Sequence, residues 1–185
     1  MSVASLDIPA YVTGEWSIDP VHSEISFSVR HLMVTRVRGR FTAFSGRIVT
    51  DSDPLKSSVV AEIDASSIDT KNADRDSHLR SSDFLDVAAY PTITFRSTEI
   101  RPLGQGYLIT GELTLHGVTK TIALETQVEG PASNGKGGTV VGFTATTEIN
   151  RRDFGVTISL PLEGGGVVVG DQITIQLDIE AVLNS

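Results

Sequence analysis

The chain contains no cysteine among its 185 residues. Disulfide bonds and zinc sites with thiolate ligands are therefore excluded. The four histidines, His22, His31, His78 and His116, show no close ligand spacing such as His-x-His. His22 and His31 lie at the start and the end of one predicted strand, roughly 30 Å apart if that strand is straight. The sequence therefore predicts no metal site and no cofactor, and we expect hydrogen-bonded structural histidines instead.

Positive charge is scarce. Lys and Arg total 15 against 23 acidic residues, which gives a net charge of −8. Binding to a phosphate backbone needs clustered cations, so nucleic acid is not expected as a partner. The acidic residues are spread along the chain, a distribution that favours solubility.

Long apolar runs are also missing. No stretch approaches the roughly 18 uninterrupted apolar residues of a membrane helix. The first 13 residues contain no Lys or Arg, and they carry Asp7 and Pro9 where a signal peptide would be hydrophobic. We therefore expect no integral membrane segment and, for the chain as given, a cytoplasmic location. Leu6, Ile8 and Tyr11 could lie across the end of the domain or fray.

Alternation of apolar and polar residues is the main pattern. In residues 24–31, Ile25, Phe27 and Val29 fall on one face, and residues 170–182 alternate in the same way. A period of two is typical of half-buried β-strands.

Residues 39–50 are expected to form one long strand, although Phe41 and Phe44 are out of phase. A bulge near Ala43 or Gly46 would reconcile the two phenylalanines and curve the strand.

Residues 72–90 contain the one good helical segment. Asn72 is a candidate N-cap, and Asp74 and Asp76 follow where the helix dipole favours acid. Pro91 forces an end.

The pattern predicts eight or nine strands joined mostly by short loops. At this length one domain is expected, residues 14–185, after an extended leader of residues 1–13. Long antiparallel strands leave costly edges unless the sheet closes. We therefore predict an all-β fold, a closed antiparallel β-barrel of about eight strands with one short helical excursion. A two-sheet sandwich is the competing architecture.

Four motifs resemble signatures of the YceI-like family, also called the polyisoprenoid-binding or lipocalin-like family. The first comprises Trp16, Asp19, His22, Ser23, Phe27 and His31. The second comprises Arg75, Asp76, His78, Leu79, Arg80, Ser81, Asp83 and Phe84. The third and fourth are residues 111–122 and 150–155. Leu85 departs mildly from the family, which often has an aromatic residue there.

The resemblance, which spans about residues 16–182, implies an elongated lipocalin-like barrel. It also implies non-enzymatic binding, transport or storage of a long-chain lipid, such as a polyisoprenoid, an isoprenoid quinone or a fatty-acid derivative. Many family members are exported, and the expected cytoplasmic location departs from them. A homodimer remains open.

Two other function classes stay open. A lipid or ester hydrolase could use Asp19, His22 and Ser23, or Asp76, His78 and Ser81, although neither set lies on a nucleophile elbow. A ligand-free interaction module is the other alternative.

The strand apolar residues either fill the barrel or line a tunnel, and the resemblance favours a tunnel. The expected lining comprises Phe27, Val29, Phe41, Phe44, Phe84, Phe95, Leu113, Leu115, Phe143, Phe154, Ile175 and Leu177.

Contacts with a polar head group are assigned to His22, Arg36, Arg38, Arg80 and Arg152. Residues two apart on a strand share a face, so Arg36, Arg38 and Arg40 could meet one pyrophosphate together. The competing interpretation is structural: solvated arginines on a strand face, and arginine–carboxylate pairs that hold the helical excursion to the barrel.

Overall fold

The computed structural model describes residues 10–32, 34–159 and 169–185. The predicted leader contacts of Leu6 and Ile8 lie outside these residues. In chain order the elements are β1 (Gly14–Ile18), β2 (Glu24–His31), β3 (Thr35–Phe41), β4 (Phe44–Thr50), η1 (Pro54–Lys56), β5 (Ser58–Asp64), η2 (Ala65–Ser67), β6 (Ile68–Asp69), α1 (Ala73–Arg80), β7 (Thr92–Leu103), β8 (Gly106–Leu115), β9 (Val118–Ser133), β10 (Thr139–Asn150), η3 (Arg151–Phe154) and β11 (Val169–Leu183).

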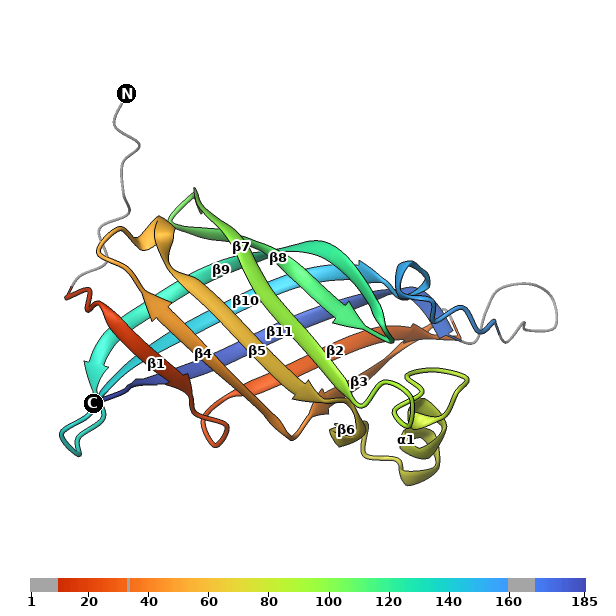
Figure 1. The fold of residues 1–185 in the computed structure, drawn as a ribbon. Helices are drawn as coiled ribbons and strands as arrows, with labels where there is room; N and C mark the ends of the chain where they lie inside the picture. The colour runs from red at the N-terminus through yellow and green to blue at the C-terminus, as the bar shows by residue number, and fades with distance from the viewer. Residues whose placement is uncertain (1–9, 33, 160–168) are drawn as a thin grey trace.

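The strands form one closed, elongated antiparallel barrel (Figure 1). Around the ring the order is β1, β4, β5, β7, β8, β9, β10 and β11, and β1 then pairs with β11. At the closing strand, Trp16 is opposite Ile48 of β4 and Leu183 of β11. The predicted eight-stranded barrel is confirmed.

Three positions of the ring are each made of two shorter strands: β1 with β2, β4 with β3, and β5 with β6. Both β1 and β2 run antiparallel to β11, and β4 and β3 pair with them in turn. The predicted continuous strand over residues 39–50 is therefore wrong in detail. It is two strands, because the chain turns a corner at Thr42 and Ala43 and not at a bulge within one strand.

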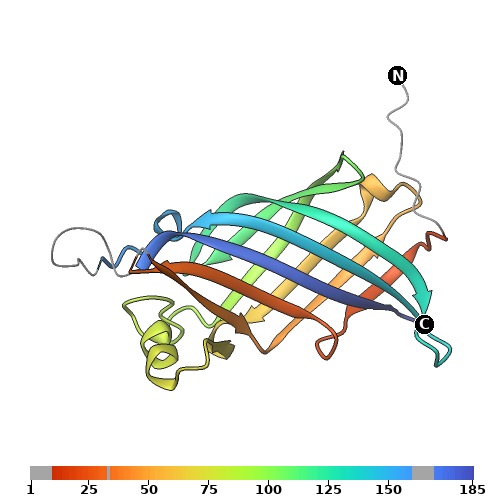
Figure 2. The same cartoon turned by 180° about the vertical axis from the view of Figure 1, so that it is seen from behind.

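One end of the barrel, here called the α1 end, carries α1, η3 and the β8–β9 turn (Figures 1 and 2). The other, here called the C-terminal end, carries the last residue of the chain and the β9–β10 hairpin. His116 and Gly117 both have positive φ, at 54° and 72°, which suits a two-residue hairpin turn between β8 and β9.

The helix is shorter than expected. Asn72 caps it as predicted, because its side chain accepts a hydrogen bond from the backbone N–H of Arg75 at 3.0 Å. The helix ends at Arg80, and Ser81 caps the other end through its hydroxyl, which donates to the backbone oxygen of His78. Residues 81–91 continue in turns, since Ser and Asp side chains there compete with helical hydrogen bonds.

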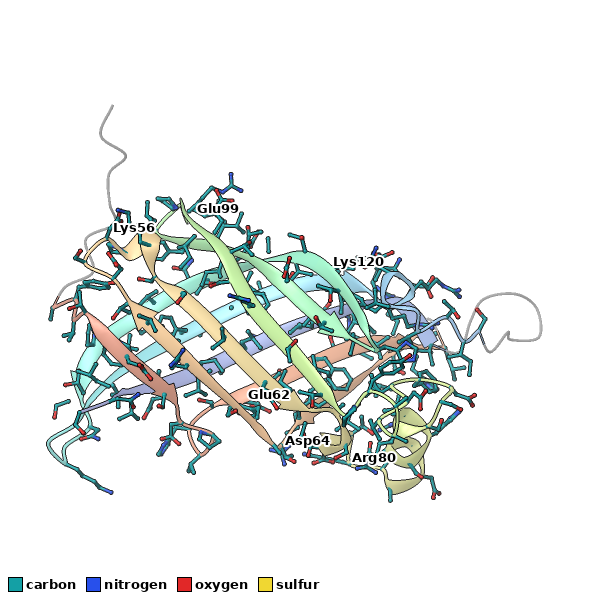
Figure 3. The ribbon with its side chains drawn as sticks, in the orientation of Figure 1. Lys56, Glu62, Asp64, Arg80, Glu99 and Lys120 are labelled. Carbon is teal, nitrogen blue, oxygen red and sulfur yellow. The ribbon has the colours of Figure 1, made fainter. Side chains whose placement is uncertain are left out.

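Alternation places polar side chains outside the wall and apolar side chains inside. Exposed charges such as Glu62, Glu99 and Lys120 lie on the outer surface (Figure 3). Buried apolar residues form two clusters, one around Phe154 and Ile93 and one around Trp16 and Ala181. Within the described residues, no helix is long and apolar enough to cross a membrane.

Candidate functional site: an apolar cavity in the barrel

The barrel interior contains a cavity of about 270 Å³, here called the large cavity. Its lining is apolar except for Ser26, Thr126, Thr147 and Arg151. An engineered protein cavity of about 150 Å³ binds benzene. The large cavity therefore has room for an apolar group substantially bigger than benzene. Of the two interiors that the sequence left open, a packed core and a tunnel, the structure shows a hollow barrel.

Strand β11 shows how the sequence makes this lining. Ile173, Ile175, Leu177 and Ile179 all face the cavity, and the polar residues between them face away. The alternation that identified the strand therefore also identified its lining residues.

Gly111 fixes the position of Phe95, another residue that lines the large cavity. The ring of Phe95 on β7 lies against Gly111 of β8, where an added Cβ would come within 2.5 Å of the ring. The glycine provides space for the ring beside the wall, so the ring covers the backbone and leaves the centre of the barrel open.

The helical excursion covers the α1 end of the cavity. Leu79, Phe84 and Leu85 come from this excursion and line the large cavity. The excursion is anchored at Thr70, whose backbone N–H and hydroxyl both donate to the buried carboxylate of Asp76.

Two arginines strengthen that anchor through oxygen atoms of the chain. Arg75 donates to the hydroxyl and the backbone oxygen of Thr70, both at 2.8 Å. Arg80 donates to the backbone oxygens of Ser66 and Ile68. The predicted arginine–carboxylate pairing of the excursion is therefore wrong in its partners, because these guanidinium groups bind carbonyl and hydroxyl oxygens.

Arg151 is the only charged residue in the described lining of the large cavity. Its side chain is 5% exposed, and it donates to the backbone oxygens of Val156 and Gly170. Its Nη2 also lies 3.2 Å from a carboxylate oxygen of Asp171. Burial lowers the pKa of Arg151, and the neighbouring Asp171 opposes that shift.

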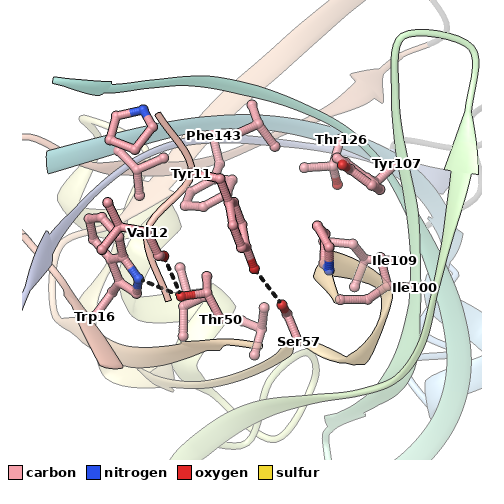
Figure 4. A pocket seen from close by; sticks show the side chains of 16 residues that line it. Tyr11, Val12, Trp16, Thr50, Ser57, Ile100, Tyr107, Ile109, Thr126 and Phe143 are labelled. Atoms are coloured by element: carbon pink, nitrogen blue, oxygen red, sulfur yellow. Dashed lines mark hydrogen bonds between the residues drawn. The ribbon is translucent and has the colours of Figure 1, made fainter. Parts of the chain in front are cut away.

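A smaller cavity of about 70 Å³ lies at the C-terminal end (Figure 4). It shares five lining residues with the large cavity, namely Ile48, Val59, Ile109, Thr126 and Phe143. Tyr11 of the predicted leader lies across this end, and its hydroxyl donates to the backbone oxygen of Asp51. The two cavities are therefore neighbours along the interior of the barrel.

Of the twelve predicted lining residues, all but Phe44 and Phe154 line the large cavity. Phe44 starts β4 directly after the corner at Ala43, and its side chain is outside the lining. Phe154 is 1% exposed and packs in the apolar cluster of the α1 end, where it fills space. Whether the other ten contact a ligand stays a prediction.

The structure places the five predicted head-group residues outside the described interior. Neither described cavity lining includes any of them. Arg36 and Arg38 are exposed on β3, because strand alternation turns them outward when Val37 and Gly39 turn inward. Whether these two residues contact a head group at the mouth of the barrel stays a prediction.

The other three predicted head-group residues have protein partners. Arg80 anchors the helical excursion, as described above. Arg152 donates to Asp171 at 2.9 Å and to the hydroxyl of Ser159. His22 lies in the exposed connection between β1 and β2. Each of these side chains is directed to the outer surface or to a partner there, and whether any of them contacts a head group stays a prediction.

Neither hydrolase set forms a catalytic triad. His22 Nδ1 lies 2.7 Å from Asp19, but the hydroxyl of Ser23 donates to the backbone oxygen of Glu180. In the second set, His78 pairs with Asp83 at 2.8 Å and not with Asp76. A serine nucleophile needs its base within hydrogen-bond reach, and here both hydroxyls donate to backbone oxygens.

Asp19, His22 and Glu180 form an exposed cluster at the β1–β2 connection. Their potential ligand atoms lie within 4.8 Å of one another. The hydrogen bond between the two side chains raises the pKa of His22 and lowers the pKa of Asp19. Because its pKa is raised, His22 is protonated at mildly acidic pH and forms an ion pair with Asp19. A protonated imidazole is a poor metal ligand.

Sequence reasoning missed several residues of the site. Leu79 and Leu85 lie in a helical segment without a clear apolar stripe, so no periodicity marked them as lining. No signal in the sequence distinguishes Arg151 from its neighbour Arg152. The one signal for Tyr107 is that a tyrosine in an apolar strand carries a hydroxyl that needs a partner.

Comparison with known proteins places this geometry in a family. The model of the YceI-like domain matches residues 16–181. A UPF0312 protein of Vibrio cholerae is 41% identical over 139 residues, which cover 74% of each chain. A UPF0312 protein of Yersinia enterocolitica is 39% identical over 152 residues, 80% of this chain and 79% of the relative.

Solved structures show the same barrel. BcnA of Burkholderia cenocepacia superposes with a TM-score of 0.75 and 25% identity, over 88% of this chain and 98% of that one. A polyisoprenoid-binding domain from Saccharophagus degradans superposes with a TM-score of 0.71 over 94% of this chain and 100% of that one; at 16% identity this likeness concerns the fold. The chain belongs to the YceI-like domain family.

Proposed function

We propose that this protein binds an elongated apolar lipid inside the barrel and carries or stores it without altering it chemically. The observation that carries the proposal is the large cavity, whose described lining is aliphatic and aromatic apart from three hydroxyl residues and one charged residue. Each CH₂ group moved from water into such a lining contributes about 0.8 kcal/mol. The polyisoprenoid-binding domain with the same fold supports a chain-like ligand.

Mass spectrometry of an organic extract of the purified protein tests this proposal first. We expect lipid ions at close to one equivalent per chain. Uptake of the apolar fluorophore N-phenyl-1-naphthylamine by delipidated protein then tests the cavity directly. Protein that carries no lipid and takes up no fluorophore would overturn the proposal.

Substitutions at two adjacent residues of β11 test whether the fluorophore binds in the large cavity. Ile175 lines the large cavity and Gln176 is exposed on the other face of the strand. Ile175→Asp should abolish fluorophore uptake because a carboxylate would be buried among apolar groups, whereas Gln176→Asp should leave uptake unchanged. Phe27→Arg, at the cross-strand partner of Ile175 on β2, tests the adjacent strand of the same wall in the same way.

A cavity-filling variant separates loss of uptake from loss of fold. Ala145 lines the large cavity and is buried. Ala145→Leu should reduce uptake while the protein keeps its native circular dichroism, because the new side chain occupies ligand space. Full uptake by a folded Ala145→Leu protein would place the ligand elsewhere.

A further inference from the structure

Tyr107 carries an unpaired polar atom in the barrel interior. It is 6% exposed, and its hydroxyl is the one fully buried side-chain nitrogen or oxygen without a hydrogen-bond partner in the described part of the chain. Leaving such a group unpaired costs about 1–3 kcal/mol. Buried polar groups without partners are rare in native proteins, so a partner for this hydroxyl is expected from outside the chain.

The position of Tyr107 is fixed by the sheet. It is the second residue of β8, opposite Thr126 of β9, and both residues line the small cavity (Figure 4). Burial raises the pKa of the Tyr107 phenol, so the hydroxyl keeps its proton and can donate it.

The other polar side chains around the small cavity are already paired. The hydroxyl of Thr126 donates to the backbone oxygen of Leu124, and the hydroxyl of Thr50 donates to that of Val12. The indole N–H of Trp16 donates to Thr50, and the hydroxyl of Tyr11 donates to Asp51. The hydroxyl of Ser57 accepts from the backbone N–H of Asp51 and lies 3.3 Å from the hydroxyl of Tyr11. Among the described lining residues, Tyr107 therefore supplies the free hydrogen-bonding group of this cavity.

Charge separates the two ends of the interior. The described lining of the small cavity contains no Lys, Arg, His, Asp or Glu. A phosphate or carboxylate placed there would be buried without a counter-ion, at a large free-energy cost. Arg151, which lines the large cavity only, already binds two backbone oxygens and Asp171.

From this arrangement we propose that the bound lipid ends in an uncharged carbonyl-type oxygen, and that this oxygen accepts a hydrogen bond from the Tyr107 hydroxyl in the small cavity. The apolar remainder of the lipid extends past Ile109 and Phe143, which line both cavities, into the large cavity. The inference rests on the proposed lipid-binding function and adds the head-group class, its anchor and its direction in the barrel.

Displacement of N-phenyl-1-naphthylamine by three probes of similar length tests the head-group class. The probes are 2-heptadecanone, heptadecane and hexadecanoate. Wild-type protein should bind the ketone roughly five- to tenfold more tightly than the alkane, which is the ratio that one net hydrogen bond supplies. Hexadecanoate should bind more weakly than the ketone at pH 8. Tighter binding of hexadecanoate would overturn the inference.

The variant Tyr107→Phe tests the anchor. It should lower ketone affinity by the same five- to tenfold, leave alkane affinity unchanged, and leave the delipidated protein as stable as wild type or more stable. The control Tyr90→Phe, on an exposed tyrosine beside His116 at the α1 end, should change neither affinity.

The outcomes separate the two proposals. If no probe displaces the fluorophore and the delipidated protein takes up neither the fluorophore nor any probe, the lipid-binding proposal itself fails. If ketone and alkane bind equally to wild type and to Tyr107→Phe, the lipid-binding proposal stands and the head-group inference fails. If Tyr107→Phe destabilises the delipidated protein without changing the ketone-to-alkane ratio, the hydroxyl serves a buried water, and the inference is again overturned.

Discussion

Phe27 lies over its cross-strand partner Gly39. The two residues are paired between β2 and β3, and a Cβ added to Gly39 would come within 2.4 Å of the phenylalanine ring. The ring also packs against Phe41, with 5.7 Å between the ring centroids. One missing methyl group thus sets how far this ring extends into the large cavity.

Gly39→Ala should push the Phe27 ring away from the wall, because the methyl group of Thr70 also lies 2.9 Å from the added atom. We expect a loss of about 1–3 kcal/mol in the free energy of unfolding and a lower capacity for the fluorophore. Gly142→Ala is the matched control, since its added Cβ would meet nothing closer than 3.5 Å. Equal effects of the two substitutions in urea unfolding would contradict this view of the wall.

Arg151→Met should destabilise the protein by about 2–4 kcal/mol. The substitution leaves the backbone oxygens of Val156 and Gly170 without their donor and removes a buried cation from Asp171. Arg152→Met, at a partly exposed neighbour that shares Asp171, should cost less than about 1 kcal/mol. Urea unfolding midpoints at unchanged m-value measure the contrast, and a larger effect at Arg152 would refute it.

Stability should depend on pH through His22 and Asp19. The raised pKa of His22 means that its contribution is complete below its ordinary pKa of 6.5 and is lost as pH rises through the raised value. The lowered pKa of Asp19 means that its contribution is complete above 3.8 and is lost as pH falls through the lowered value. Both contributions are therefore present between pH 3.8 and 6.5.

His22→Gln measures this dependence. The difference in unfolding free energy between wild type and variant should be larger at pH 5 than at pH 9. Glu180 raises the pKa of His22 further and Lys136 opposes it, so Asp19→Asn should remove most of the dependence but not all. A difference that is the same at both pH values would show that the pair does not contribute.

Asp76→Ala should loosen the helical excursion that covers the α1 end. Thr70 would lose the acceptor of both its backbone N–H and its hydroxyl, at a cost of about 1–3 kcal/mol. Because Leu79 and Phe84 line the cavity from this excursion, fluorophore release in stopped-flow measurements should also become faster. Asp74→Ala, an exposed acid in the same first turn, should change stability by less than about 1 kcal/mol and leave the release rate unaltered.

The sequence predicted the wall of the barrel well because one pattern encodes both the strands and their inner face. Alternation alone places Ile175 and Leu177 on the inner face, and alternation persists wherever one face of a strand is apolar. The family resemblance was needed to favour a tunnel over a packed core. Phe44 failed because the corner at Thr42 and Ala43 has no strong turn residue, so the break in the strand was taken for a bulge.

The pattern of residues in the sequence could not predict the polar part of the site. Arg36 and Arg38 share a strand face, as predicted, but composition does not say which face is inside. Arg151 and Arg152 are adjacent and chemically identical, yet one is buried and the other is partly exposed. The unpaired state of the Tyr107 hydroxyl depends on every neighbour within hydrogen-bond reach, and only three-dimensional placement supplies that.

The closing strand of the barrel has a consequence for biosynthesis. Ser17 of β1 donates to Asn184, 167 positions away, and the neighbouring Trp16 is opposite Leu183. Contacts of such long sequence separation form slowly and need both chain regions to be present. During translation the wall can therefore close only after β11 has left the ribosome, so the barrel cannot enclose a lipid before that point.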